Sequence, residues 1–261
     1  MPHDGLIRLL ATLMVFAALL FWENKRPRRA LVKRRAQRWP GNLGVALLNT
    51  LIVRLLLPGF IPVLIAYQAA SAQFGLLNQL SLPFVVELLI TLLLLDLLIY
   101  WQHRLFHRIP LLWRLHRMHH TDPAVDVTTA LRFHPLEIAL SLLIKSLVVW
   151  LLGAPVVAVL LFEVLLNGLA MFNHANLTLP KHIDVLLRKV VVTPDMHRVH
   201  HSVLGNEHNS NFGFNLSCWD RWFGSYIDQP REGHQQMRLG LNETNSQPTG
   251  SLVWMLKQPF K

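Results

Sequence analysis

Four long apolar stretches constrain the fold of this chain more than any other feature of its sequence. They cover residues 6–22, 45–70, 85–101 and 138–173. A helix needs about 20 apolar residues to cross the roughly 30 Å hydrocarbon core of a bilayer, and the first stretch is just long enough. Only 15% of the residues are charged, whereas about a quarter are charged in an average soluble domain. The sequence therefore predicts an all-α integral membrane protein.

The fourth stretch is too long for one span. A single helix over residues 138–173 would be about 54 Å long at about 1.5 Å per residue. Gly153 and Pro155 interrupt its middle, which indicates a helix end and a turn. We expect a helical hairpin of residues 138–152 and 156–173, short enough to be re-entrant. Prolines should kink the second stretch but leave it one span, so the expected architecture is roughly three spans plus the hairpin.

The positive charge is concentrated between the first two apolar stretches. The formal net charge is +10, and residues 25–38 hold eight of the basic side chains. A nucleic-acid-binding arm is one interpretation. The positive-inside rule explains a basic loop between two spans better, as a cytoplasmic loop beside anionic lipids. We therefore expect membrane lipids and no nucleic acid as partners. The basic loop should determine the orientation of the spans. The alternative is that its arginines bind a lipid headgroup.

The sidedness of the remaining chain follows from this loop. The second span leaves the cytoplasm, the third returns, and the hairpin enters and leaves the membrane on the same side. Residues 102–137 and everything after residue 173 are then cytoplasmic, including the C-terminus. These two segments contain most of the histidines, so the histidines should meet in one compartment.

The chain has fourteen histidines, and eight of them form clusters. Their patterns are H-x3-H, H-x2-H-H and a later H-x2-H-H, made by His103, His107, His116, His119, His120, His197, His200 and His201. Histidines three or four residues apart share one face of a helix, and neutral imidazole is the commonest protein ligand for transition metals. Because a mononuclear site rarely needs more than four protein ligands, eight histidines imply two metal ions.

The other six histidines lie outside these three motifs. His174 is expected to be a ligand, because it lies where the hairpin returns to the histidine side. His134 precedes Pro135, so it fits a helix-entry residue as well as a ligand for metal or substrate. Four are expected to be incidental: His3, His182, His208 and His234.

Acidic residues near the clusters could accept the second ring N–H of a ligand histidine. The candidates are Asp122, Asp126, Glu137 and Asp195, and exposed loop acids are the alternative interpretation. Other histidine chemistry is excluded, because the chain has no H-E-x-x-H metalloprotease motif and no C-x-x-C-H haem motif. The single cysteine cannot form a disulfide within the chain.

Several motifs resemble those of the fatty acid hydroxylase/sterol desaturase superfamily, especially its bacterial sterol-desaturase-like branch. They are LWRLHRMHHTD, RFHPLE, FNHANL, TPDMHRVHHS and WDRWFGSY, together with the spacing of the histidines. The resemblance runs over about residues 95–227. It divides the chain into N-terminal transmembrane helices with the basic loop (1–94), a catalytic domain (95–227) and a tail (228–261), and it implies a bacterial inner membrane protein.

This resemblance implies a membrane-bound non-haem di-iron oxygenase. Such enzymes use two iron ions, O₂ and electrons from a separate ferredoxin, cytochrome b5 or reductase to hydroxylate or desaturate a C–H bond of a lipid. The resemblance assigns the eight clustered histidines and His174 as ligands, with no catalytic residue beyond them. Thr178 stands where fatty acid 2-hydroxylases carry a further histidine, which argues against that subfamily. Two alternatives remain open: a zinc-dependent membrane hydrolase, and a metal-binding membrane protein without catalytic activity.

Overall fold

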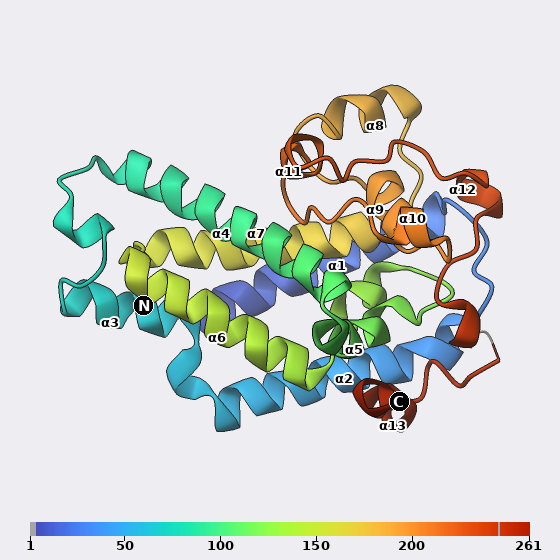
Figure 1. Ribbon diagram of the computed structural model, residues 1–261, viewed down its shortest axis with the longest axis horizontal. Coiled ribbons are helices and arrows are strands. Elements are labelled where there is room, and N and C mark those ends of the chain that lie inside the picture. Colours follow the sequence, from blue (N-terminus) through green and yellow to red (C-terminus); the bar gives the residue numbers. More distant parts are fainter. Residues whose placement is uncertain (1–3, 245) are drawn as a thin grey trace.

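The computed structural model describes residues 4–244 and 246–261 and confirms the all-α prediction (Figure 1). Within these residues no strand forms, only isolated β-bridges. His3 lies outside the described residues. The longer helices come first in the chain: α1 (Asp4–Lys25), α2 (Arg35–Leu56), α3 (Pro62–Ser71), α4 (Phe84–Arg108), α5 (Pro110–His120), α6 (Pro135–Leu152) and α7 (Val156–His174). The short helices follow: α8 (Lys181–Leu187), α9 (Pro194–His200), α10 (Gly205–His208), α11 (Cys218–Trp222), α12 (Gly233–Gln236) and α13 (Leu252–Leu256).

Five of the described helices, α1, α2, α4, α6 and α7, are long and apolar enough to cross a membrane. They run along the long axis of the molecule, while α8 to α12 gather toward one end (Figure 1). Many of their apolar side chains face outward: Met14 is 67% exposed, Leu55 72% and Leu147 57%. A protein in water rarely exposes such an extensive apolar surface, so these helices indicate a membrane protein.

The second apolar stretch differs from the expected single span. It forms the end of α2, a 3₁₀ turn (Pro58–Phe60) and α3. Pro58 and Pro62 lack the backbone N–H that continues a helix, and each begins a new element instead. Only α2 has the length to cross a membrane. It begins at Arg35, so the end of the basic segment forms its first turn.

α6 and α7 form the expected helical hairpin. α6 ends at Leu152, and Gly153 adopts the left-handed conformation with φ 64°, which favours glycine at the end of a helix. Pro155 precedes the first turn of α7. Gly75 packs against this turn so closely that a Cβ at Gly75 would lie 2.2 Å from the backbone nitrogen of Gly153. The hairpin brings the chain back to the end of the bundle at which α6 begins (Figure 1).

A buried ion-pair cluster joins the basic segment to the connection between α5 and α6. Arg38, in the first turns of α2, is fully buried. Its Nε donates to Asp122 Oδ1 at 2.7 Å, and its Nη1 donates to Asp126 Oδ2 at 2.8 Å. Both carboxylates are fully buried as well. The pairing therefore fixes α2 against the segment that directly follows the second histidine motif.

A second buried guanidinium ties in the C-terminal segment. Arg132 donates to Asn42 Oδ1 at 2.8 Å and to the carbonyl oxygen of Thr249 at 2.6 Å. The C-terminal segment also passes very close to α2, since a Cβ at Gly41 would lie 2.1 Å from the carbonyl oxygen of Gly250. Residues far apart in the sequence are thus held together at the histidine end of the bundle.

Other arginines of the basic segment also bind protein groups. The pairs are Arg28 with Asp195 (2.9 Å), Arg29 with the carbonyl oxygen of Met237 (2.7 Å) and Arg35 with Glu23 (3.0 Å). Arg26 and Arg34 are exposed. Part of the basic segment therefore stabilises the histidine end directly, a role that its charge alone does not reveal.

Replacing Arg38 by glutamine should destabilise the protein strongly. The change removes the cation that lies closest to both Asp122 and Asp126, and breaking a buried pair in this way costs about 3–5 kcal/mol. The free energy of unfolding of the detergent-solubilised protein measures the effect. Arg26→Gln, at an exposed position of the same segment, is the control and should stay within about 0.5 kcal/mol. Equal stability of Arg38→Gln and Arg26→Gln would show that the buried ion pairs of Arg38 do not stabilise the fold.

Candidate metal centre

Five histidines from three helices form a first cluster. His103 and His107 lie on α4, His116 and His120 on α5, and His200 on α9. One ligand atom from each lies within 4.8 Å of all the others. The Nε2 atom of His120 is 3.1 Å from that of His107 and 3.2 Å from that of His116. The side chains therefore converge on one small volume.

Four histidines form a second cluster beside the first. His119 of α5, His174 at the end of α7, and His197 and His201 in and after α9 bring ligand atoms within 4.8 Å of one another. The Nε2 atom of His174 is 3.0 Å from that of His119 and 3.1 Å from that of His197. The hairpin places His174 here, as its position in the sequence suggests.

Each H-x2-H-H motif supplies both clusters. In the first motif, His116 and His120 belong to the first cluster and His119 belongs to the second. In the later motif the assignment is reversed: His200 belongs to the first cluster, and His197 and His201 belong to the second. Adjacent residues on a helix point about 100° apart, so a pair such as His119 and His120 can serve two neighbouring sites. The rings of His119 and His120 have centroids 5.2 Å apart.

Backbone carbonyls hold several of the rings in one orientation. The Nδ1 atom of His103 lies 2.8 Å from the carbonyl oxygen of Phe212, and that of His200 lies 2.7 Å from the carbonyl oxygen of Ser210. A carbonyl can only accept, so Nδ1 carries the proton and Nε2 carries the lone pair. His174 donates in the same way to the carbonyl oxygen of Ala170 at 2.7 Å.

The unpaired ring nitrogens suit a metal. The Nε2 atoms of His103 and His200 are buried and have no hydrogen-bond partner, and neither ring nitrogen of His201 has one. Burial lowers the pKa of the rings outside the membrane-spanning helices: to about 3 for His116, and well below the usual value for His119, His120, His197, His200 and His201. The imidazoles are therefore neutral, which is the form that binds metal ions. Nine nitrogen donors in two groups fit two transition-metal ions.

The four acidic candidates separate into two kinds. Glu137, in the first turn of α6, has Oε1 2.6 Å from Nδ1 of His116 and so orients a clustered ring. Among the described residues the other three contact arginines instead of clustered rings. Asp122 and Asp126 pair with Arg38, and Asp195 pairs with Arg28 and Arg198. The sequence could not distinguish these roles, because each depends on partners far away in the chain.

His134 lies outside both clusters. Its Nδ1 accepts a hydrogen bond from the backbone N–H of Leu136 at 3.2 Å, so it caps the start of α6. Its Nε2 faces the carbonyl oxygen of Leu256 at 3.2 Å. Of its two interpretations, the structure shows the helix-entry position.

His208 was expected to be incidental, but it packs against the first cluster. Its ring centroid is 4.4 Å from that of His120 and 4.8 Å from that of His107, and neither of its nitrogens has a partner. Burial lowers its pKa to about 4. Its only signal in the sequence is its position seven residues after the last clustered histidine. His182 is exposed, and His234 faces Asp195 at 3.6 Å.

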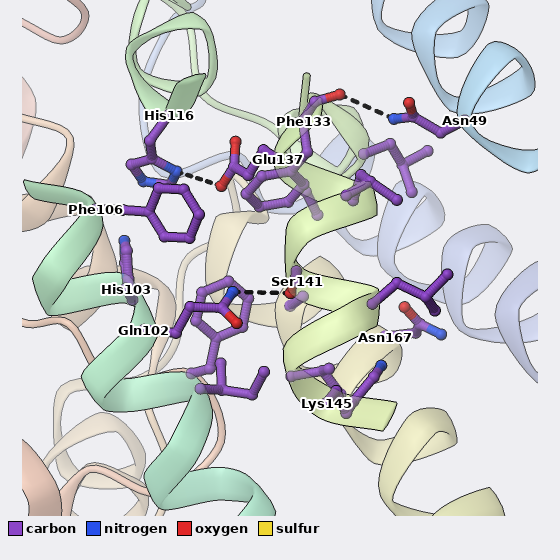
Figure 2. A pocket seen from close by; sticks show the side chains of 18 of the residues that line it. Asn49, Gln102, His103, Phe106, His116, Phe133, Glu137, Ser141, Lys145 and Asn167 are labelled. Atoms are coloured by element: carbon purple, nitrogen blue, oxygen red, sulfur yellow. Dashed lines mark hydrogen bonds and ion pairs between the residues drawn. The ribbon is translucent and has the colours of Figure 1, made fainter. Parts of the chain in front are cut away.

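A cavity of about 310 Å³ lies between α2, α4, α6 and α7 and reaches the first cluster (Figure 2). His103 and His116 form part of its wall, and most of the remaining lining is apolar. Polar groups also face it, including Gln102, whose Nε2 donates to Ser141 Oγ at 2.8 Å. The cavity therefore connects the first histidine cluster to the interior of the helix bundle.

The chain is similar to known lipid-modifying proteins. It is 28% identical over 179 residues to the ornithine lipid hydroxylase OlsE of Rhizobium tropici, a match that covers 68% of this chain and 51% of that protein. It is 31% identical over 143 residues to the alkylglycerol monooxygenase of Xenopus tropicalis, covering 54% of this chain and 30% of that protein. The human alkylglycerol monooxygenase is 29% identical over 132 residues, covering 49% of this chain and 27% of that protein.

The chain thus spans about half the length of the first of these relatives and less than a third of the other two. No solved structure matches it significantly. The family model described as fatty acid hydroxylase matches residues 88–225, more than half of the chain. This match includes all nine clustered histidines, and the chain therefore belongs to the fatty acid hydroxylase family.

Proposed function

We propose that this protein is a non-haem di-iron enzyme that uses O₂ and external electrons to hydroxylate a C–H bond of a membrane lipid. The observation that carries the proposal is the convergence of nine buried imidazoles in two adjacent groups. One iron would be held by His103, His107, His116, His120 and His200. The other would be held by His119, His174, His197 and His201. Bound iron would supply the oxidising power that no side chain has.

The residues around the clusters position the ligands and limit access of water. Glu137 fixes the ring of His116, and carbonyl groups fix three further rings. Burial of eight of the nine rings keeps bulk water from the reacting centre. The cavity beside His103 and His116 gives a substrate a way to reach the first cluster.

A lipid is the substrate class that the surroundings favour. The cavity lies among helices that are apolar enough to cross a membrane, so a lipid can approach it from within the bilayer. The names of the relatives, an ornithine lipid hydroxylase and alkylglycerol monooxygenases, favour hydroxylation over desaturation. We place the catalytic part in residues 95–227, with the clusters and the C-terminus facing the cytoplasm of a bacterial inner membrane. A ferredoxin, a cytochrome b5 or a reductase would supply the electrons.

His119→Ala should remove iron from the second group and abolish lipid hydroxylation. The wild-type protein, purified anaerobically, should contain about two iron ions per chain, and the variant fewer, since each ligand lost weakens the site. His182→Ala is the matched control, because His182 is exposed on α8. Iron content and the O₂- and reductant-dependent change in lipid mass are the measurements. Both variants should remain in the membrane fraction.

Different results would contradict this function in different ways. Less than one iron per chain, with no O₂-dependent lipid oxidation, would overturn the di-iron oxygenase. Turnover in the absence of O₂ would point to a zinc-dependent hydrolase. An unchanged lipid profile in cells that carry only His119→Ala would indicate a metal-binding protein without catalytic activity.

Glu137→Gln should weaken iron binding and activity without unfolding the protein. The amide keeps the shape of the carboxylate but loses the charge that supports His116, and changes of this kind typically cost about 10- to 100-fold in metal affinity or activity. Iron affinity by competition with a chelator, together with the hydroxylation rate, tests this. Glu243→Gln, at a largely exposed carboxylate, should match the wild type. An unaltered affinity in Glu137→Gln would show that Glu137 does not support the ligand.

A further inference from the structure

One face of α6 carries a row of polar side chains along the cavity. Glu137, Ser141 and Lys145 follow one another at intervals of four residues and all line the cavity. Residues spaced by four lie above one another on a helix. The row therefore spans about 12 Å, at about 1.5 Å per residue. It begins at the carboxylate that contacts His116 and ends at the ammonium group of Lys145 (Figure 2).

An ion-pair cluster closes the far end of this row. Lys145 Nζ lies 3.3 Å from Glu163 Oε1 of α7, and Arg8 of α1 pairs with the other oxygen of Glu163. The Lys145 side chain is 13% exposed and that of Glu163 is 8% exposed. The three residues belong to three helices that are long and apolar enough to cross a membrane. Ionisable residues inside such helices are costly and usually mark a functional site.

Lys145 shares its acidic partner with a second cation. Glu163 divides its two carboxylate oxygens between Lys145 and Arg8. Among the side chains that the structure describes, no other acid pairs with Lys145. A cation among apolar helices is stable only when an anion or polar groups compensate it. For Lys145, one shared carboxylate provides this compensation.

The ammonium group of Lys145 is accessible from the cavity. Lys145 lines the cavity wall, and its ammonium group has three N–H donors besides its ion pair with Glu163. Asn167 also lines the cavity and lies one turn after Glu163 on α7, so its amide is on the same face. Figure 2 shows Lys145 and Asn167 at the end of the cavity opposite His116. An ion cluster that only joined helices would not need to face a cavity.

We propose that Lys145, assisted by Asn167, binds an anionic group of the lipid substrate, a carboxylate or a phosphate. This inference rests on the proposed function in one respect, that the cavity beside His103 holds the substrate. The anion adds to the compensation that Glu163 gives Lys145, and the part of the lipid that is oxidised lies toward the histidine end. The substrate class is thus an anionic or zwitterionic lipid, and neutral sterols and hydrocarbons are excluded.

Binding of a lipid acid and of its neutral ester tests the proposal. The full-length protein in a neutral maltoside detergent is titrated with N-palmitoylglycine and with its methyl ester, and tryptophan fluorescence gives the dissociation constants. We expect the acid to bind about tenfold more tightly, as a charge-assisted hydrogen bond allows. Lys145→Gln should remove this preference, and Lys145→Arg should retain it. Lys189→Gln, at an exposed lysine of the connection after α8, should leave it unchanged.

A second variant distinguishes loss of the anion site from a folding defect. Asn167→Asp adds a negative charge beside the cluster without removing any of its ion pairs, and it should weaken binding of the acid more than that of the ester. Circular dichroism and gel filtration report whether each variant is folded. Equal affinities for acid and ester in the wild type, or a preference that survives in folded Lys145→Gln, would overturn the proposal.

Inorganic phosphate separates a lipid anion from a free one. It should not displace N-palmitoylglycine, because the acyl chain supplies part of the affinity; full displacement by phosphate would overturn the assignment to a lipid. The titrations need no O₂ or reductant and measure no turnover. A failure of the hydroxylase assay with intact acid selectivity would therefore refute the reaction and leave the subsite, and the reverse result would refute the subsite alone.

Discussion

Convergent ring nitrogens in a buried volume are the constraint on which the rest of this structure depends. A neutral imidazole has one N–H and one lone pair, so rings whose N–H groups face carbonyls, as in His103 and His200, turn their lone pairs toward one another. Buried polar atoms without partners cost free energy. The proposed metal ions would remove this cost. Without them, contacts with the surrounding chain have to keep the rings in place despite the unpaired nitrogens.

That support comes from elements that are distant in the sequence. α4 and α7 contribute histidines near their last turns, so the clusters lie where separate membrane-type helices end side by side. Arg38 and Arg132 then anchor the connection after α5 to α2 and to the C-terminal segment. Buried guanidinium groups suit this task, because several fixed donors can bind different segments at once. The basic segment therefore contributes to the stability of the site as well as to the charge of the chain.

Features that arise from residues close together in the sequence could be predicted, and features that depend on distant residues could not. Helix periodicity and metal chemistry are local, so the spacing of the histidines indicated the clusters, and Gly153 with Pro155 indicated the hairpin. The partners of Asp122 and Asp126 are not local: two acids near a histidine motif look alike whether they face a ring or Arg38. The packing of His208 against His120 had no clear signal in the sequence, because a single histidine has no spacing to interpret. The break at Pro58 needed a choice between a kink and a helix end, which the packing of α3 decides.

α6 links the orientation of a ligand to the environment of the cavity. Its first turn carries Glu137, which contacts His116, and two turns later it carries Lys145. A helix is stiffer than a loop, so the separation of about 12 Å between these two positions is set by the backbone rather than by mobile side chains. If an anionic group of the lipid occupies the far end, the same helix determines which carbon reaches the histidines. Regioselectivity would then follow from helix geometry, and moving the cation by one turn would be expected to move the site of oxidation.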